Sequence, residues 1–102
     1  MDTSEFGRFS DPALMILASL AGGEKHGYAM LEDIETMTGV RLGPGTLYGA
    51  LSRLEQSGLI EALPADERRR PYKLTTQGAV SLRKYLASLK KIVTLGLKRL
   101  GA

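Results

Sequence analysis

Residues 43–55 constrain the fold of this chain more than any other stretch. They read Gly-Pro-Gly-Thr-Leu-Tyr-Gly-Ala-Leu-Ser-Arg-Leu-Glu. Proline directly after a glycine is typical of a helix start, because proline has no N–H to leave unpaired and its φ is already helical. Leu47, Leu51 and Leu54 recur at helical spacing and predict one buried face. Gly58 predicts a left-handed end to this helix.

The opposite face of the predicted helix carries two glycines, short polar groups and an arginine: Gly45, Thr46, Gly49, Ser52 and Arg53. A glycine inside a helix costs about 1 kcal/mol relative to alanine, so two of them need a reason. Close approach of the DNA major groove is one, since short donors and an arginine reach base edges and phosphates. Packing against another helix is the alternative. Tyr48 can send its hydroxyl to a phosphate, and Arg53 can instead pair with Glu55 or another carboxylate.

Two further helices are predicted before this stretch. Ser10-Asp11-Pro12 is typical of a helix start, and the run to Ala21 is apolar on nearly every side. A helix that is apolar all round needs cover that a small domain rarely supplies alone, so we expect Leu14 and Leu17 to contribute to a dimer interface.

The second helix is predicted over residues 27–38 and ends at Gly39. Its apolar stripe is Tyr28, Leu31, Ile34 and Met37. Two helices joined by a short glycine-containing turn form a helix-turn-helix, whose second helix reads the major groove.

After Gly58 the pattern predicts a β-hairpin, with strands near residues 59–63 and 70–74 and a tip over residues 64–69. Pro71 is expected on the solvent side or at an edge. A hairpin after a helix-turn-helix is a wing, and we predict that its cations contact a minor groove or phosphates: Arg68, Arg69, Arg70 and Lys73. The alternative is a solvated turn whose arginines are partly neutralised by Asp66 and Glu67.

Thr75 caps a predicted final helix over residues 76–100. A row of residues repeats at intervals of 4 and 3 and predicts a coiled-coil dimer seam: Leu82, Leu86, Leu89, Val93, Gly96 and Leu100. A secondary hypothesis is that paired helices leave room for a small-molecule effector, with walls at Tyr85, Leu89, Ile92 and Val93. The basic face of this helix is a candidate for contact with flanking DNA phosphates.

The composition excludes several classes of function. The chain has 102 residues and a net charge of +3, enough for one domain. It has no cysteine and only one histidine, His26, so we expect neither a metal site nor a cofactor. Glu32, Asp33 and Glu35 lie on a polar face without signs of a cleft, and we expect no enzyme. No membrane span or signal peptide is evident, so the predicted location is the cytoplasm.

The charge distribution favours a nucleic-acid partner. From Gln77 onward there are six basic residues and no acidic one, whereas the first 76 residues hold eight basic against eleven acidic. A second basic group lies at the predicted wing.

The sequence resembles the PadR-like winged-helix transcriptional regulators over nearly its whole length. The resemblance rests on Lys25-His26-Gly27-Tyr28, Gly43-Pro44-Gly45-Thr46-Leu47-Tyr48, Arg53-Leu54-Glu55, Gly58-Leu59-Ile60, and Pro71-Tyr72-Lys73-Leu74-Thr75 with Gly78. It implies a homodimer that binds a pseudo-palindromic operator and usually represses, often until a small molecule releases it. Gly43 stands where the family often has serine, and no effector pocket transfers residue by residue. The single C-terminal helix is similar to the short subfamily.

The predicted fold is mainly α with a small β-hairpin, a winged helix-turn-helix plus a long C-terminal dimerisation helix. We predict an N-terminal arm over residues 1–9, a DNA-binding domain over 10–75 and the dimerisation helix over 76–102. The predicted function is that of a dimeric, sequence-specific transcriptional regulator, a repressor released by an effector. The alternative is a winged-helix protein-interaction or ligand-sensing module that does not bind DNA.

Overall fold

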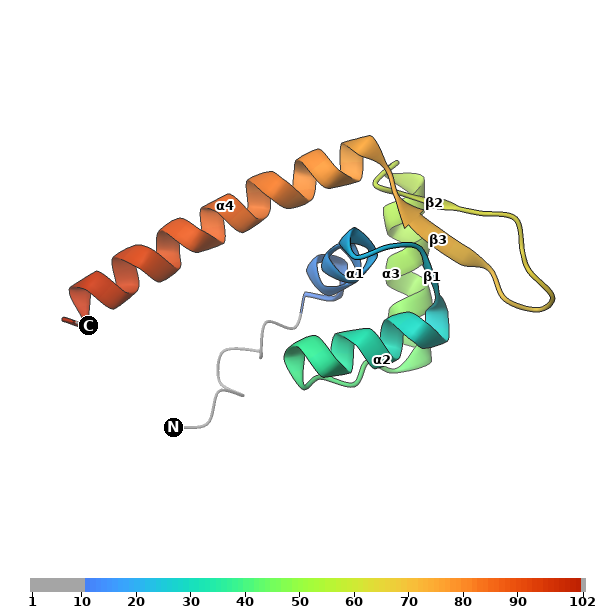
Figure 1. The fold of residues 1–102 in the computed structure, drawn as a ribbon, viewed down its shortest axis with the longest axis horizontal. Coiled ribbons are helices and arrows are strands. Elements are labelled where there is room, and N and C mark those ends of the chain that lie inside the picture. Colours follow the sequence, from blue (N-terminus) through green and yellow to red (C-terminus); the bar gives the residue numbers. More distant parts are fainter. Residues whose placement is uncertain (1–10, 102) are drawn as a thin grey trace.

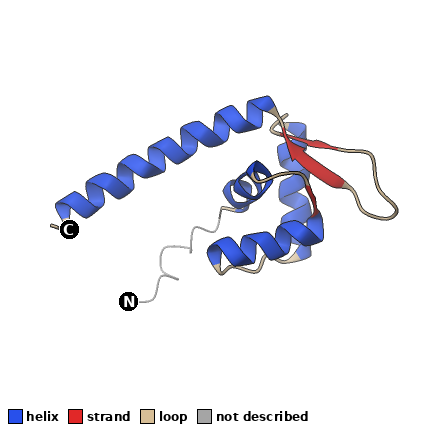
Figure 2. Cartoon of the chain, in the orientation of Figure 1, coloured by secondary structure: helices blue, strands red, loops and turns tan. Residues whose placement is uncertain are grey.

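A computed structural model describes residues 11–101, so the predicted arm lies outside the described residues. The elements along the chain are α1 (Pro12–Ala21), β1 (Lys25–His26), α2 (Gly27–Thr38), α3 (Pro44–Gln56), β2 (Ile60–Ala62), β3 (Pro71–Leu74) and α4 (Thr76–Arg99). The first three helices and the sheet pack together, while α4 extends away from them and the loop between β2 and β3 projects at the opposite end (Figure 1; Figure 2). The predicted winged-helix architecture is confirmed.

The core lies among α1, α2 and α3. The leucines of α3 are buried as predicted, with Leu47 and Leu51 at most 1% exposed. Most of α1 is also buried, because its apolar residues meet both neighbouring helices and the start of α4. Asp11 caps α1 by accepting a hydrogen bond from the backbone N–H of Ala13 at 3.0 Å.

The buried face of α2 differs from the predicted stripe. Leu31 and Ile34 are buried, but Tyr28 is 60% and Met37 46% exposed, and Met30 is fully buried in their place. The predicted stripe advanced three residues at every step, whereas a helix turn takes 3.6 residues. Its two ends therefore rotate out of the buried face on opposite sides.

A polar network ties α1 to α2 inside this core. The hydroxyl of Ser19, which is 1% exposed, donates to Asp33 Oδ2 at 2.6 Å. Lys25 Nζ donates to the Ser19 carbonyl at 2.6 Å and lies 3.9 Å from the same carboxylate oxygen. Asp33 therefore has a structural role.

The sheet has three antiparallel strands in the order β1-β3-β2, one more than the predicted hairpin. His26 of β1 pairs with Pro71, and Ile60 of β2 pairs with Leu74. The prediction that Pro71 lies at an edge is wrong, because β3 is the central strand. Pro71 is tolerated there because it is the first residue of β3, where a missing N–H disturbs the ladder least. Its carbonyl still accepts a hydrogen bond from the Leu63 N–H at 2.8 Å.

The junction between β3 and α4 is tightly tied to the end of α3. Thr75 caps α4 as predicted, accepting a hydrogen bond from the Gly78 N–H at 3.0 Å and donating its hydroxyl to the Gly58 carbonyl at 2.7 Å. Its backbone N–H donates to the Leu59 carbonyl at 3.1 Å. Gly58 has a φ of 77°, the left-handed end that the sequence predicted for α3.

Gly78 permits this close junction, and replacing it with alanine is expected to destabilise the fold. A Cβ at this position would overlap the Leu59 carbonyl, which is backbone and cannot rotate away. Overpacking of this kind costs about 1–3 kcal/mol, and each kcal/mol lowers the melting temperature by about 4–8 °C in a domain of this size. Thermal unfolding followed by circular dichroism measures the shift.

Gly49→Ala is the matched control for this prediction. A Cβ at Gly49 meets only the Arg53 guanidinium, at an ordinary 3.6 Å, so the same change should not lower stability there. Equal melting temperatures for Gly78→Ala and the wild type would contradict the proposed role of Gly78.

Candidate nucleic-acid interface

The face of α3 opposite the leucines forms a continuous surface. Gly45, Gly49, Ser52 and Gln56 follow one another at intervals of 4, 3 and 4 residues and lie on the side away from the core. All are exposed except Gly49, which is partly exposed, and Thr46 and Arg53 flank this row on its exposed side. The structure thus brings together the α3 residues that the sequence predicted as one surface.

The two glycines of α3 serve no packing contact within the chain. A Cβ at Gly45 would meet no atom within 4 Å among residues 11–101, and one at Gly49 would make only the 3.6 Å contact with Arg53. Within residues 11–101, therefore, neither glycine allows close packing against another helix. Arg53 forms no ion pair among the described residues, so its predicted pairing with Glu55 is not observed.

Tyr48 lies where α3 meets the start of α2. Its ring is 53% exposed, and a Cβ on Gly27 would come within 2.5 Å of its hydroxyl oxygen. Gly27 therefore provides the space that the tyrosine occupies. Thr46 lies two residues nearer the N-terminus, about half a helical turn away, and is also exposed, so both polar groups border the same helix end.

Tyr72 of β3 lies beside the C-terminal half of α3. Burial raises the pKa of Tyr72 above its ordinary value of 10.0, and the negative charge of Glu55 adds to the rise. Arg70 opposes it, while Tyr48 adds a further small rise. The Tyr72 hydroxyl therefore stays protonated at neutral pH and remains a hydrogen-bond donor at the base of the wing.

The cations of the wing differ in how firmly they are held. Arg70 Nη1 donates to the Leu63 carbonyl at 3.1 Å, and Lys73 Nζ lies 3.7 Å from Glu61 Oε1. Arg68 makes no hydrogen bond or ion pair within the described part of the chain, and it lies at the tip of the turn. Asp66 and Glu67 form no ion pair with the arginines there, so the predicted neutralisation of the tip is not observed.

The turn at the wing tip is closed by its backbone. Asp66 and Arg69 exchange two backbone hydrogen bonds of 2.8 Å, with Glu67 and Arg68 between them. Glu67 has a φ of 54°, a conformation that a non-glycine residue adopts in few places. The guanidinium of Arg68 is thus presented on a short, defined turn.

His26 connects the wing to the helix-turn-helix. Its Nδ1 accepts a hydrogen bond from the Ala29 N–H at 3.4 Å, which caps α2, and its Nε2 lies 3.4 Å from Arg69 Nη1. Among residues 11–101 there is no group of three or more metal-ligating side chains. His26 thus satisfies a backbone N–H at the start of α2.

One functional candidate beside α3 was not predicted from the sequence. Arg41 lies in the turn before α3, with Nη1 3.3 Å from Glu35 Oε1 and its guanidinium carbon 5.9 Å from the centre of the Tyr28 ring. Both contacts position a cation next to the N-terminal end of the exposed α3 face. The signal in the sequence was a lone arginine two residues before Gly43.

Comparison with known proteins decides the family. Residues 16–84 match the transcriptional regulator PadR-like family. The chain is a member of this family. It is therefore a winged-helix, DNA-binding transcriptional regulator.

Individual relatives agree with this assignment to the PadR-like family. The chain is 37% identical over 82 residues to the transcriptional regulator Rv3488 of Mycobacterium tuberculosis, covering 78% of this chain and 76% of that protein. It is 42% identical over 85 residues to an uncharacterized 37.1 kDa protein in transposon TN4556 of Streptomyces fradiae, covering 83% of this chain but only 25% of that protein. A PadR family transcription regulator from Clostridium difficile has the same fold, with a TM-score of 0.78, 23% identity, and coverage of 89% of this chain and 98% of that one.

The predicted dimer-interface residues of this PadR-like regulator divide into two groups. Leu17 and Leu82 are 7% and 5% exposed within a single chain, so they are core residues and we remove them from the predicted interface. Leu14 and Leu89 are half-buried, and Gly96 is exposed. Further along the row, exposure rises to 45% at Leu86, 57% at Val93 and 83% at Leu100.

A hollow of about 190 Å³ lies between α1 and α4 of the PadR-like domain. Among the residues predicted to bind an effector, Tyr85 lines it, together with Leu14, Leu82 and others. Leu89, Ile92 and Val93 do not line it and lie further along α4. No helix of the described residues is long and apolar enough to span a membrane.

Proposed function

We propose that this PadR-like regulator binds a pseudo-palindromic operator as a homodimer and represses transcription from it. In this proposal, α3 enters the major groove and the wing contacts the flanking backbone or minor groove. The observation that carries the proposal is the exposed row Gly45, Gly49, Ser52 and Gln56, which has no packing partner in the described chain. A face built from glycines and short polar side chains suits close approach to base edges.

The proposed DNA contacts fall into two classes. Thr46, Ser52 and Arg53 are candidates for base edges or nearby phosphates, and Tyr48 for a phosphate at the start of α3. At the wing, Arg68 is the best candidate, because Arg69, Arg70 and Lys73 already have contacts, to His26, the Leu63 carbonyl and Glu61 respectively. Arg41 joins the proposal as a phosphate contact beside the N-terminus of α3.

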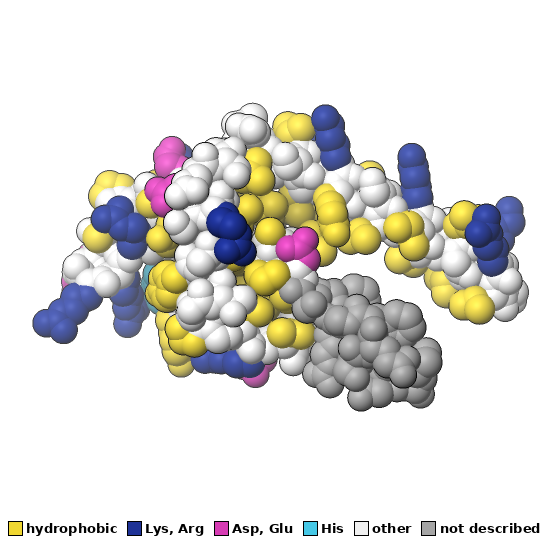
Figure 3. Space-filling model, turned by 180° about the vertical axis from the view of Figure 1, so that it is seen from behind, with side chains coloured by type: hydrophobic (Ala, Val, Ile, Leu, Met, Phe, Trp, Pro, Cys, Tyr) yellow, Lys and Arg dark blue, Asp and Glu magenta, His cyan; other side chains and the backbone are white. Residues whose placement is uncertain are grey.

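Dimerisation is proposed through α4. The row that begins in the core at Leu82 continues along the helix without cover, so its apolar side chains need a partner. Figure 3 shows hydrophobic side chains along one edge of α4 and Lys and Arg along the other. A second copy of the same row is a self-complementary cover of the kind that two-fold dimers use.

Regulation by a small molecule is the remaining part of the proposal. An apolar hollow bordered by α1 and α4 adjoins the proposed dimer seam, so an apolar or aromatic effector there would contact both elements. Its binding would change the angle between the subunits and thus the separation of the two recognition helices, which successive major grooves fix at about 34–36 Å.

Fluorescence anisotropy tests the proposed function. The protein is titrated against its own upstream region and against scrambled DNA of equal length, over a salt series. We expect the upstream DNA to bind about a thousandfold tighter or better, with affinity falling as salt rises. Equal and weak binding to both duplexes would contradict an operator in that region. Unchanged binding after charge reversal at Arg68, Arg69 and Arg70 would contradict the role of the wing. No binding of either duplex at low salt would favour an interaction module that does not bind DNA.

A further inference from the structure

The side of α4 opposite the seam is strongly basic. Lys84, Lys91 and Lys98 lie on this side and Arg83 and Lys90 flank it, and we call these five cations the basic ridge. Lys84, Lys91 and Lys98 are seven residues apart, which is close to two helical turns, so they align in one row. Arg83 and Lys90 lie beside this row, one residue before Lys84 and Lys91. All five residues are exposed.

Among the described residues, no negative charge balances the basic ridge. α4 contains no acidic residue, and the three ion pairs found among residues 11–101 all lie in the winged-helix part. A purely solvated helix face ordinarily mixes charges of both signs. A face of one sign, without ion-pair partners in the described part of the chain, favours binding of a polyanion.

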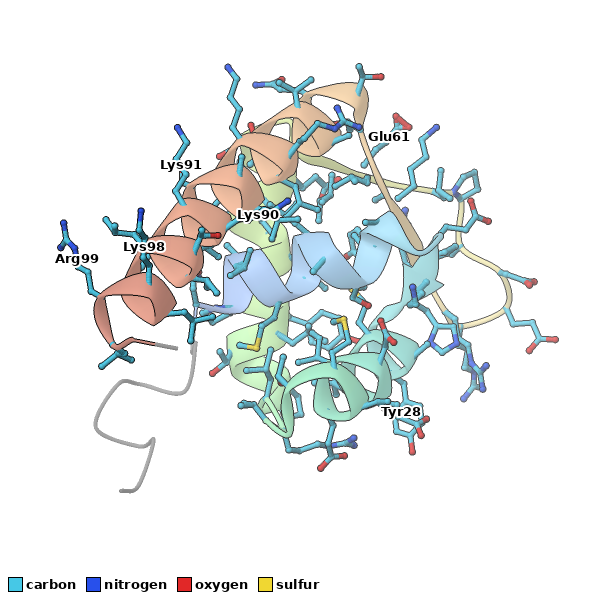
Figure 4. All side chains as sticks on the ribbon, turned by 60° about the vertical axis from the view of Figure 1, so that its left-hand side comes forward. Tyr28, Glu61, Lys90, Lys91, Lys98 and Arg99 are labelled. Carbon is cyan, nitrogen blue, oxygen red and sulfur yellow. The ribbon has the colours of Figure 1, made fainter. Side chains whose placement is uncertain are left out.

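The basic ridge points away from the DNA surface formed by α3 and the wing. Figure 4 shows Lys91 and Lys98 directed away from α1, α2 and α3. The wing projects at one end of the molecule and α4 extends toward the other (Figure 1). When the apolar seam is covered by a second copy, the ridge lies on the outside of the dimer, where a duplex lying along α3 and the wing does not reach.

The surface of the ridge fits a phosphate backbone. A shallow groove on it is lined by Lys90, Lys91 and Lys98 together with Leu95 and the small residues Ala87 and Thr94. Small side chains between lysines let a backbone approach the helix closely. Lys84 and Lys98 are about 21 Å apart at 1.5 Å per residue. Over that length duplex DNA carries about one negative charge per 1.7 Å of axis.

We propose that the basic ridge binds the phosphates of a second DNA segment, so that a dimer on one duplex bridges to another. This inference rests on the proposed function for the first duplex, which α3 and the wing hold. The ridge contacts are independent of base sequence, because lysine on a phosphate reads charge alone. A regulator with this property would bring separate sites on a chromosome together.

A bridging assay tests the proposal with the full-length protein. An operator duplex is immobilised, the protein is bound to it, and capture of a fluorescent duplex of unrelated sequence is measured at 50 and 200 mM salt. Wild type should capture the second duplex, with about 40-fold weaker affinity at the higher salt if three phosphates are neutralised. Lys84→Gln/Lys91→Gln/Lys98→Gln should lose capture, and the matched triple change to arginine should keep it.

Several results would overturn the proposal. Wild type that captures no second duplex at 50 mM salt, or a glutamine variant that captures it normally, excludes bridging through the ridge. If the glutamine variant loses affinity for the operator itself, the ridge contacts the first duplex instead. Binding to phosphatidylglycerol vesicles without capture of DNA would indicate a membrane surface. Retention of the protein on the immobilised operator is measured separately from capture of the second duplex. If the protein is not retained, the proposed function fails, whatever the ridge does.

Discussion

Replacing Val93 with glutamate is expected to convert the regulator to a folded monomer that binds its operator weakly. Val93 is 57% exposed in the single chain, so a glutamate there is solvated and the protomer should fold normally. In the proposed seam two symmetry-related glutamates would be buried together. Each uncompensated polar group costs at least about 1–3 kcal/mol. The dissociation constant of the dimer should therefore rise by about thirtyfold to ten-thousandfold. Sedimentation equilibrium measures the change, and circular dichroism reports on the fold.

Thr94→Glu is the matched control for the change at Val93. It adds the same charge one residue further along α4, on the side opposite the seam, where Thr94 is exposed and lines the groove of the basic ridge. We expect this variant to remain a dimer. A dimeric Val93→Glu protein with full operator affinity would show that the row along α4 is not the interface.

Replacing Gly49 with leucine is expected to stabilise the protein while abolishing tight operator binding. The position has room, since its only neighbour is the Arg53 guanidinium at 3.6 Å, and leucine favours a helix over glycine by about 0.8–1 kcal/mol. A leucine on the groove-facing side would displace α3 from the bases. Loss of contact to one base pair costs about 1–3 kcal/mol, and a dimer loses it at both half-sites.

Comparing Gly49→Ala with Gly49→Leu separates the steric loss of DNA affinity from the gain in helix stability. Gly49→Ala should gain similar helix stability but lose less affinity, because it adds only one methyl group to the same face. Thermal unfolding and operator anisotropy, measured on all three proteins, give the two trends. If Gly49→Leu bound the operator as tightly as wild type, this face of α3 could not lie in the groove.

The helices of this chain were predictable from the sequence because each carries its own start and stop signals. Pro12, Pro44 and Thr75 mark helix starts, and Gly39 and Gly58 mark ends in left-handed conformations. These signals act over a few residues and need no knowledge of tertiary contacts. The buried leucine face of α3 was predicted for the same reason.

The third strand and the position of Pro71 were not predictable in this way. β1 has only two residues, too few for an alternating pattern, and it exists because Lys25 and His26 meet β3 from a distant part of the chain. The same contact makes β3 central instead of an edge strand. Leu82 is the first residue of the apolar row of α4, and the sequence does not distinguish it from the rest of the row. It is buried because the start of α4 packs against α1, which is a tertiary contact.

The candidate DNA-binding residues could be identified from the sequence, whereas the side-chain contacts that each of them makes within the chain could not. The exposed residues of α3 could be placed on one surface from the sequence, because helical spacing alone determines which residues share a face. The sequence did not separate Arg68 from Arg70, since the hydrogen bond of Arg70 to the Leu63 carbonyl depends on how the hairpin closes. It also missed that Gly27 is small to accommodate Tyr48, a contact between two helices.

The hydrogen bonds of Thr75 couple the direction of α4 to the direction of α3. Hydrogen bonds from Thr75 to Gly58 and Leu59, the residues that follow α3, fix the direction of α4 relative to that helix. With 24 residues at 1.5 Å each, α4 is about 36 Å long, so a tilt of about 5° moves its far end by about 3 Å. That displacement is close to the rise of one base pair. In the proposed dimer, a small tilt of α4 would therefore change the separation of the two α3 helices by about the rise of one base pair.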